Sequence, residues 1–151
     1  MKKCNIFPPT SKRVSLKTDP QLNTEIRNQT LRNLNIYKNC DEATISERIQ
    51  NLNQEWDTER FLEVNGALLV ILSSYLGIRS SRIWFILTGT VAVFMLQHAF
   101  IGWCPPLPLA RKWGIRSEDE IQIEKMALKI MRGDFKEAHK SAEDALTMAE
   151  K

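Results

Sequence analysis

The feature that most constrains the fold of this sequence is a nearly uncharged block of 43 residues, 61–103. It contains only three charged residues, Glu63, Arg79 and Arg82, whereas acidic and basic residues crowd the segments on both sides. The two arginines separate apolar runs of 18 and 21 residues, 61–78 and 83–103. At about 1.5 Å of rise per residue, two helices of these lengths reach about 27 and 31 Å. Because the hydrocarbon core of a bilayer is about 30 Å thick, the block predicts a helical hairpin that crosses the membrane twice.

The aromatic residues of the block favour the same interpretation. Trp84 and Trp103 are 19 residues apart, which places their indoles near opposite interfaces, where Trp is favoured. The alternative is a buried hairpin inside a soluble all-α domain. That alternative requires amphipathic partner helices around both runs, and the flanking segments are too polar to supply them. The predicted fold class is therefore an all-α membrane protein, a two-helix transmembrane hairpin with amphipathic cytoplasmic helices on both sides.

The distribution of basic residues predicts the orientation of the hairpin. The turn carries Arg79 and Arg82, which are also expected to anchor it at the interface. Five basic residues lie near the other ends of the two runs: Arg48, Arg60, Arg111, Lys112 and Arg116. The excess of positive charge favours the cytoplasmic side, so both termini are expected in the cytoplasm. The first nine residues lack the apolar run of a signal peptide, in agreement with this orientation.

The segment before the hairpin is expected to contain two parts. Residues 1–43 are predicted to be disordered or loosely helical, with a helix start at Asp19-Pro20. Residues 44–60 are predicted to form an amphipathic helix. It opens with the capping box Thr44–Glu47 and repeats apolar residues three and four positions apart at Ile45, Ile49, Leu52 and Trp56.

Residues 104–151 are expected to form a cytoplasmic helical tail. A first helix is predicted after the Ser117–Glu120 capping box, ending at Gly133. Asp134 is expected to cap a last helix with one narrow apolar stripe, formed by Ala138, Ala142, Ala145, Leu146 and Ala149. Such helices either fold on one another or offer a surface to a partner.

Small residues at matching depths predict how the two transmembrane helices meet. If the turn is centred between Ser80 and Ser81, residues whose numbers sum to about 161 lie at one level, so Ser73 is level with Thr88. The pairs Ser73/Gly77 and Thr88/Ala92 have the spacing that lets helices approach closely. These faces are predicted to pack against each other; the alternative is that they pack against a partner helix.

The same depth argument brings a polar cluster together at the cytoplasmic edge. It places Glu63 level with His98, with Asn65 and Gln97 close by. Ionisable groups inside a membrane are functional candidates with a partner to be named, and here Glu63 and His98 are each other's expected partners. The plainer interpretation is that both side chains reach the nearby interface and have a structural role.

Cys104 is the cysteine with the most distinctive surroundings. It ends the second run, directly before Pro105 and Pro106, which stop a helix. A thiol at this place is a candidate sulfur carrier or redox sensor, although the negative end of a helix disfavours a thiolate. The other cysteines, Cys4 and Cys40, are far away in sequence. No metal or cofactor is expected, because no ligand spacing, P-loop or dinucleotide motif occurs.

Two short segments of the chain resemble a known family. The residues Trp56-Asp57-Thr58-Glu59-Arg60-Phe61, followed by Asn65-Gly66-Ala67, and the later Gly102-Trp103-Cys104-Pro105-Pro106 resemble the entry and exit of the YgaP-like inner-membrane transmembrane domain. The resemblance covers residues 56–108. It implies a two-helix hairpin in a bacterial inner membrane, which in some relatives follows a rhodanese domain and in others stands alone. The 151 residues leave no space for a rhodanese domain, so the stand-alone form is expected.

These observations lead to one functional prediction and one alternative. The prediction is a non-enzymatic, multi-pass bacterial inner-membrane protein that acts as a structural or accessory subunit. Its expected partners are membrane lipid and either itself or a larger membrane protein complex. A net charge of +3, spread over the chain, gives no reason to expect nucleic acid. The alternative is a thiol-based sulfur carrier or redox sensor that uses Cys104.

Overall fold

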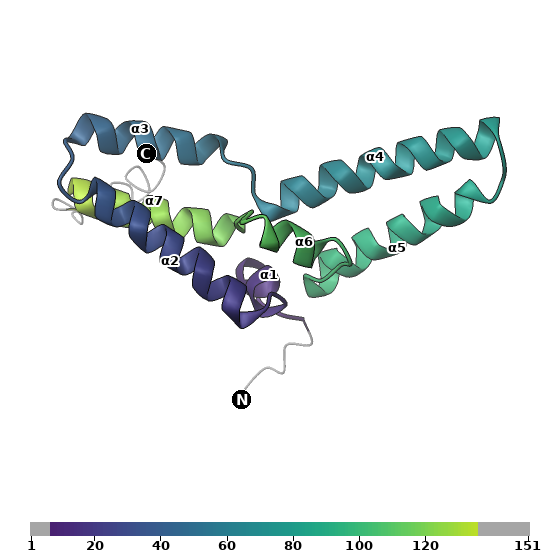
Figure 1. The fold of residues 1–151 in the computed structure, drawn as a ribbon, viewed down its shortest axis with the longest axis horizontal. Helices are drawn as coiled ribbons and strands as arrows, with labels where there is room; N and C mark the ends of the chain where they lie inside the picture. Colours follow the sequence, from purple (N-terminus) through teal and green to yellow (C-terminus); the bar gives the residue numbers. More distant parts are fainter. Residues whose placement is uncertain (1–6, 136–151) are drawn as a thin grey trace, which may run out of the picture. The chain divides into compact units, whose positions relative to one another are not determined.

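A computed structural model of the chain describes residues 7–135, and every regular element in that range is a helix (Figure 1). The residues fall into two compact units, which we describe separately. The first unit contains residues 7–26 and 56–119, and the second contains residues 27–55 and 120–135. Cys4 and the last predicted helix, with its alanine stripe, lie outside the described residues.

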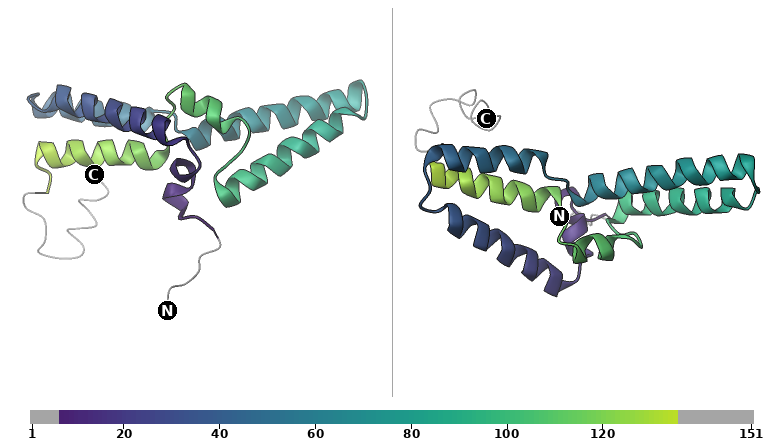
Figure 2. Two further views of the ribbon diagram at one scale, coloured as in Figure 1. Left: turned by 60° about the horizontal axis from the view of Figure 1, so that its bottom comes forward. Right: turned by 45° about the horizontal axis from the view of Figure 1, so that its top comes forward.

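The transmembrane hairpin makes up most of the first unit. Its helices are α4 (Thr58–Arg79) and α5 (Trp84–Ile101), which run side by side in both views of Figure 2. Asp57 begins α4 by accepting a 2.6 Å hydrogen bond from the amide of Arg60, and Gly102 ends α5 in the left-handed conformation. Both helices are long and apolar enough to span a membrane. The protein is thus an all-α membrane protein.

Residues 10–16, for which either disorder or loose helix was expected, are helical. They form the 3-10 helix η1 (Thr10–Lys12) and the short helix α1 (Arg13–Leu16). Val14 is buried in a cluster with Leu62, Cys104 and Leu107. Leu107 belongs to α6 (Leu107–Lys112), so α1 and α6 both pack near the ends of the hairpin that are distant from its turn. One buried valine is too little to produce a periodic pattern, which is why the sequence gives no sign of this docking.

The second unit is built from three amphipathic helices. They are α3 (Glu42–Gln54), the later part of α2 (Pro20–Tyr37) and most of α7 (Glu118–Arg132). Its core consists of Ile45, Ile49, Leu52, Ile121 and Leu128, with Leu34, Tyr37 and Cys40 packed against it. Helix α3 begins two residues before the predicted start, with Asp41 as N-cap. It ends at Gln54, so Trp56 lies beyond it and is exposed.

Candidate functional site

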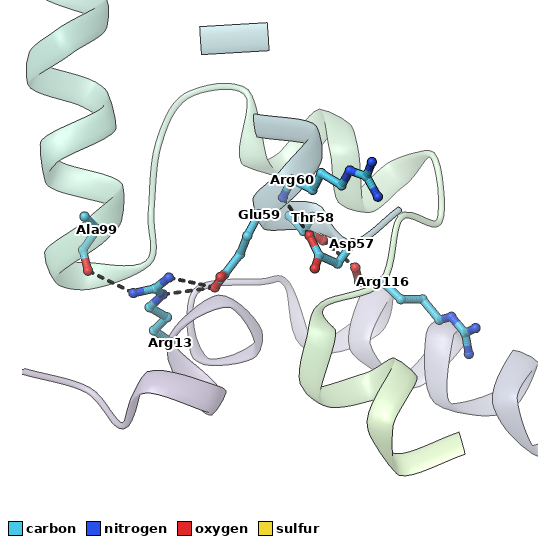
Figure 3. A network of polar contacts seen from close by, with 7 residues as sticks. All are labelled: Arg13, Asp57, Thr58, Glu59, Arg60, Ala99 and Arg116. Atoms are coloured by element: carbon cyan, nitrogen blue, oxygen red, sulfur yellow. Dashed lines mark hydrogen bonds and ion pairs between the residues drawn. The ribbon is translucent and has the colours of Figure 1, made fainter. Parts of the chain in front are cut away.

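Arg13 ties the two transmembrane helices together where they are furthest from the turn (Figure 3). Its Nη2 and Nε donate to Glu59 Oε1 near the start of α4, at 2.8 and 3.1 Å. Its Nη1 donates to the carbonyl oxygen of Ala99 near the end of α5, at 3.1 Å. A guanidinium presents its donors in a rigid fork, so one side chain can fix two helices at once.

Thr58 holds the segment after α6 against the start of α4. It is fully buried, and its amide donates to the carbonyl oxygen of Arg116 at 2.8 Å. Its Oγ1 lies 2.9 Å from the same oxygen and 3.1 Å from that of Ile115. We call these contacts and those of Arg13 the base network; Figure 3 shows it with the Asp57 cap. The network closes the base of the hairpin with residues distant in sequence.

The end of α5 approaches the backbone of α1 directly. Gly102 is buried and has a φ of 74°. A Cβ built on Gly102 would lie 2.6 Å from the carbonyl carbon and oxygen of Arg13. Glycine is therefore required here twice, by its conformation and by the close approach.

A cavity of about 580 Å³ opens beside the base network, between α4 and α5. Three members of the predicted polar cluster, Glu63, Asn65 and His98, line it together with Cys104. Gln97 does not; its Nε2 donates to the carbonyl oxygen of Trp103 at 3.4 Å. The structure therefore places three of the four predicted polar-cluster residues and the predicted thiol around one space.

Glu63 and His98 were expected to pair. Within residues 7–135, no hydrogen bond or ion pair joins them. Glu63 is exposed, and the amide of Asn65 donates to the carbonyl oxygen of Phe61 at 2.7 Å. Both ring nitrogens of His98 are buried, and neither has a hydrogen-bond partner in the described part of the chain. His98 is thus a polar group of the cavity whose buried ring nitrogens have unused hydrogen-bonding capacity.

Cys104 is 4% exposed and packs in the apolar cluster around Val14 and Leu62. Burial raises the pKa of the Cys104 thiol, and this effect exceeds the opposite effect of the Leu107 amide. A thiol in such surroundings is protonated near neutral pH and reacts slowly, because the thiolate is the nucleophile.

The small residues predicted to pack between the helices are divided between two surfaces. Ser73 and Gly77 are buried in the seam. Ser73 Oγ lies 2.7 Å from Thr88 Oγ1, while the ring of Phe85 fills the space opposite Gly77. Ala92 is exposed on the outside of the hairpin.

The four predicted interface anchors are all exposed. Trp84 and Trp103 are 37% and 36% exposed, and Arg79 and Arg82 lie at the turn. This arrangement suits side chains that reach into the headgroup region.

Arg13, Thr58 and Arg111 are structural residues that the sequence analysis did not single out for these roles. In the sequence, Arg111 is one of the basic residues that predict the orientation of the hairpin. In the structure its side chain is 1% exposed, so it is a buried residue. It donates to Asn23 Oδ1 and to the carbonyl oxygen of Ile115, both at 3.1 Å. No local pattern reveals these roles, because the partners of Arg13, Thr58 and Arg111 lie up to 88 residues away.

Thr58→Val tests the base network by removing a hydroxyl with little change of shape. We expect a loss of about 1 to 2 kcal/mol, because the hydroxyl no longer donates the hydrogen bond that the carbonyl oxygens of Arg116 and Ile115 share. The midpoint of urea-dependent alkylation of Cys104 in mild detergent measures the effect on the first unit. Thr24→Val, at an exposed position of α2, is the control. Equal midpoints for the two variants would show that the hydroxyl is dispensable.

Together, these features define a class of protein: a two-helix membrane hairpin closed at its base by its own flanking segments. Within residues 7–135, no group of three or more His, Cys, Asp and Glu side chains is placed to hold a metal ion. Residues 57–118 match the family model described as "Inner membrane protein YgaP-like, transmembrane domain", so this part of the chain is similar to that domain. Comparisons with curated proteins and with solved structures find no match. The matched range extends past the hairpin to the segment that binds Thr58.

Proposed function

We propose that this chain is a non-enzymatic bacterial inner-membrane protein that acts as a structural or accessory subunit. The observation that carries the proposal is the outer surface of the hairpin. None of the residues of α5 is buried, and only four of α4 are: Thr58, Leu62, Ser73 and Gly77. Two helices that bury so little apolar surface in one chain are covered by lipid and by other transmembrane helices.

The exposed side of α5 contains a place where another helix can approach closely. Gly89 and Ala92 are both exposed, three residues apart. A Cβ built on Gly89 meets no atom within 4 Å in the described chain. Helices associate in membranes mainly through close packing at such small residues. We therefore place the contact with a second copy, or with another membrane protein, at this side of α5.

Gly89→Leu tests this assembly without changing the contacts of the hairpin itself. Native mass spectrometry after mild-detergent purification is expected to show a homo-oligomer or a stoichiometric complex for the unchanged protein. Gly89→Leu is expected to weaken it about tenfold, while Ala67→Leu, at an exposed position of α4, leaves it intact. A strictly monomeric protein with no co-purifying chain overturns the proposal.

We place both termini in the cytoplasm, on the basis of the two turn arginines against five basic residues near the other ends. In intact cells, a membrane-impermeant maleimide is expected to label Ser80→Cys in the turn and to leave Cys40 unlabelled. Labelling of Cys40 without labelling of Ser80→Cys would show that the turn faces the cytoplasm instead.

The alternative, sulfur transfer or redox sensing at Cys104, requires an accessible thiolate. The burial and raised pKa of Cys104 weigh against it. We expect Cys104 to be alkylated more slowly than the half-buried Cys40, and its rate to rise only at a pH above the ordinary range for thiols. Rapid alkylation near neutral pH, together with persulfide labelling that disappears in Cys104→Ser, would favour the alternative.

A further inference from the structure

The cavity beside the base network has walls unlike those of a water-filled crevice. The apolar side chains of Leu62, Leu69, Val91, Phe94 and Met95 all line it. Its volume, about 580 Å³, lies in the range of small-molecule sites. Gly66 also lines it, and a Cβ there would lie 2.9 Å from Met95 Sδ. A larger residue at Gly66 would push Met95 out of its place, so the shape of the cavity depends on this glycine.

The charges around the cavity exclude an anionic ligand. Arg13 is the one cation among the residues that line it, and its charge is met by Glu59. Glu63 adds a second, exposed carboxylate. Two negative charges against one positive charge repel a phosphate or carboxylate headgroup. The apolar walls, in turn, give a free cation little compensation for its lost water.

His98 identifies the polar group that a ligand must carry. The Arg13 donors and the Asn65 amide already bond to the protein, whereas both His98 ring nitrogens are buried without a partner in residues 7–135. A buried polar group without a partner is costly, so a ligand that supplies one gains affinity. An imidazole offers at least one N–H in either protonation state, and a carbonyl oxygen accepts it.

We propose that this cavity binds an uncharged, membrane-soluble molecule that carries a carbonyl group, with the carbonyl at His98 and the apolar body between α4 and α5. Two kinds of membrane molecule have this chemistry, a quinone ring with its apolar tail and a glycerolipid with its ester carbonyl. This binding site is additional to the proposed role of the hairpin in assembly, because neither Gly89 nor Ala92 lines the cavity.

Protection of Cys104 from alkylation reports occupancy, because Cys104 lines the cavity. The complete protein in mild detergent is treated with iodoacetamide, and the Cys104 and Cys40 peptides are quantified separately. The probes are decylubiquinone, whose ring is fully substituted and so does not add thiols, and dioctanoylglycerol. Decylbenzene, which has no carbonyl group, is the control for the carbonyl. Dodecyl phosphate, which is an anion, is the control for the charge.

We expect one carbonyl-bearing probe to slow the alkylation of Cys104 about fivefold at several times its dissociation constant, with Cys40 unaffected. Protection by decylubiquinone alone identifies the quinone as the source of the carbonyl, and protection by dioctanoylglycerol alone identifies the ester. His98→Phe is expected to weaken the binding of the carbonyl-bearing probe about fivefold, to the affinity of decylbenzene.

Two tryptophan variants form the matched pair. Val91→Trp fills the cavity and is expected to abolish protection, whereas Val93→Trp, at a position 61% exposed on the same helix, preserves it. The proposal is overturned if no probe protects Cys104, if decylbenzene protects as well as the carbonyl compounds, or if the two tryptophan variants behave alike. A retained oligomer in Val91→Trp would show that assembly and binding are separate.

Discussion

Arg48→Met is expected to destabilise the second unit by about 3 kcal/mol, one of the two largest effects predicted for this chain. Arg48 donates from Nη2 and Nε to Glu124 Oε1 at 2.8 and 3.1 Å, and Glu124 is fully buried. The amide of Asn33 lies 3.4 Å from the other carboxylate oxygen. Removing the guanidinium takes the charge of Arg48 away from a buried carboxylate, which costs more than the pair itself contributes.

The double variant Arg48→Met with Glu124→Leu separates the cost of taking Arg48 away from the buried carboxylate from the contribution of the ion pair. Replacing both charges by apolar groups removes the desolvation penalty, so we expect it to recover much of the lost stability. Cys40 packs against the core of the second unit, and the urea dependence of its alkylation measures unfolding there. Arg27→Met, at an exposed position of α2, is the control. The prediction is contradicted if Arg48→Met is as stable as Arg27→Met.

The sequence itself carries a sign of this ion pair. In α7, Glu124 lies three residues after Ile121 and four before Leu128, on the apolar face of the helix. In α3, Arg48 lies between Ile45 and Ile49, next to the apolar face of that helix. Two opposite charges at core positions of two amphipathic helices indicate a buried pair, once the helices are assumed to face each other.

The hairpin could be predicted because hydropathy is a local property. A run of about 20 apolar residues reveals a span without any knowledge of its neighbours, and the charges at Arg79 and Arg82 located the turn. The matching depth of Ser73 and Thr88 followed from the length of that turn. The match of residues 57–118 to the YgaP-like family model confirms the resemblance drawn from the two short motifs.

The closure of the base could not be predicted, because it depends on contacts between distant segments. Arg13 binds Glu59 and Ala99 across 46 and 86 residues. Val14 is the one buried residue of α1, so no periodic pattern marks the segment. The cavity has the same origin: Glu63 and His98 were placed at one level by depth, but the space between the helices follows from side chains such as Met95 packing beside Gly66.

Gly102→Ala is expected to release the base of the hairpin. A residue other than glycine at a φ of 74° costs about 1 to 2 kcal/mol, and the new Cβ, 2.6 Å from the Arg13 carbonyl, forces the two backbones apart. Overpacking of this kind costs about 1 to 3 kcal/mol more. Because Cys104 packs in one cluster with Val14 of α1, we expect displacement of α1 to make Cys104 alkylated at lower urea concentrations and much faster without urea.

Gly114→Ala separates the cost of the positive φ from the cost of the clash with Arg13. Gly114 lies in the same unit with a φ of 78°, but a Cβ built there meets no atom within 4 Å in the described chain. It should therefore show the conformational cost alone, which is about 1 to 3 kcal/mol less than the total for Gly102→Ala. In a chain that lacks residues 1–16, the clash is absent and the two variants should cost the same. Equal costs in the full-length chain would mean that α1 does not dock against Gly102.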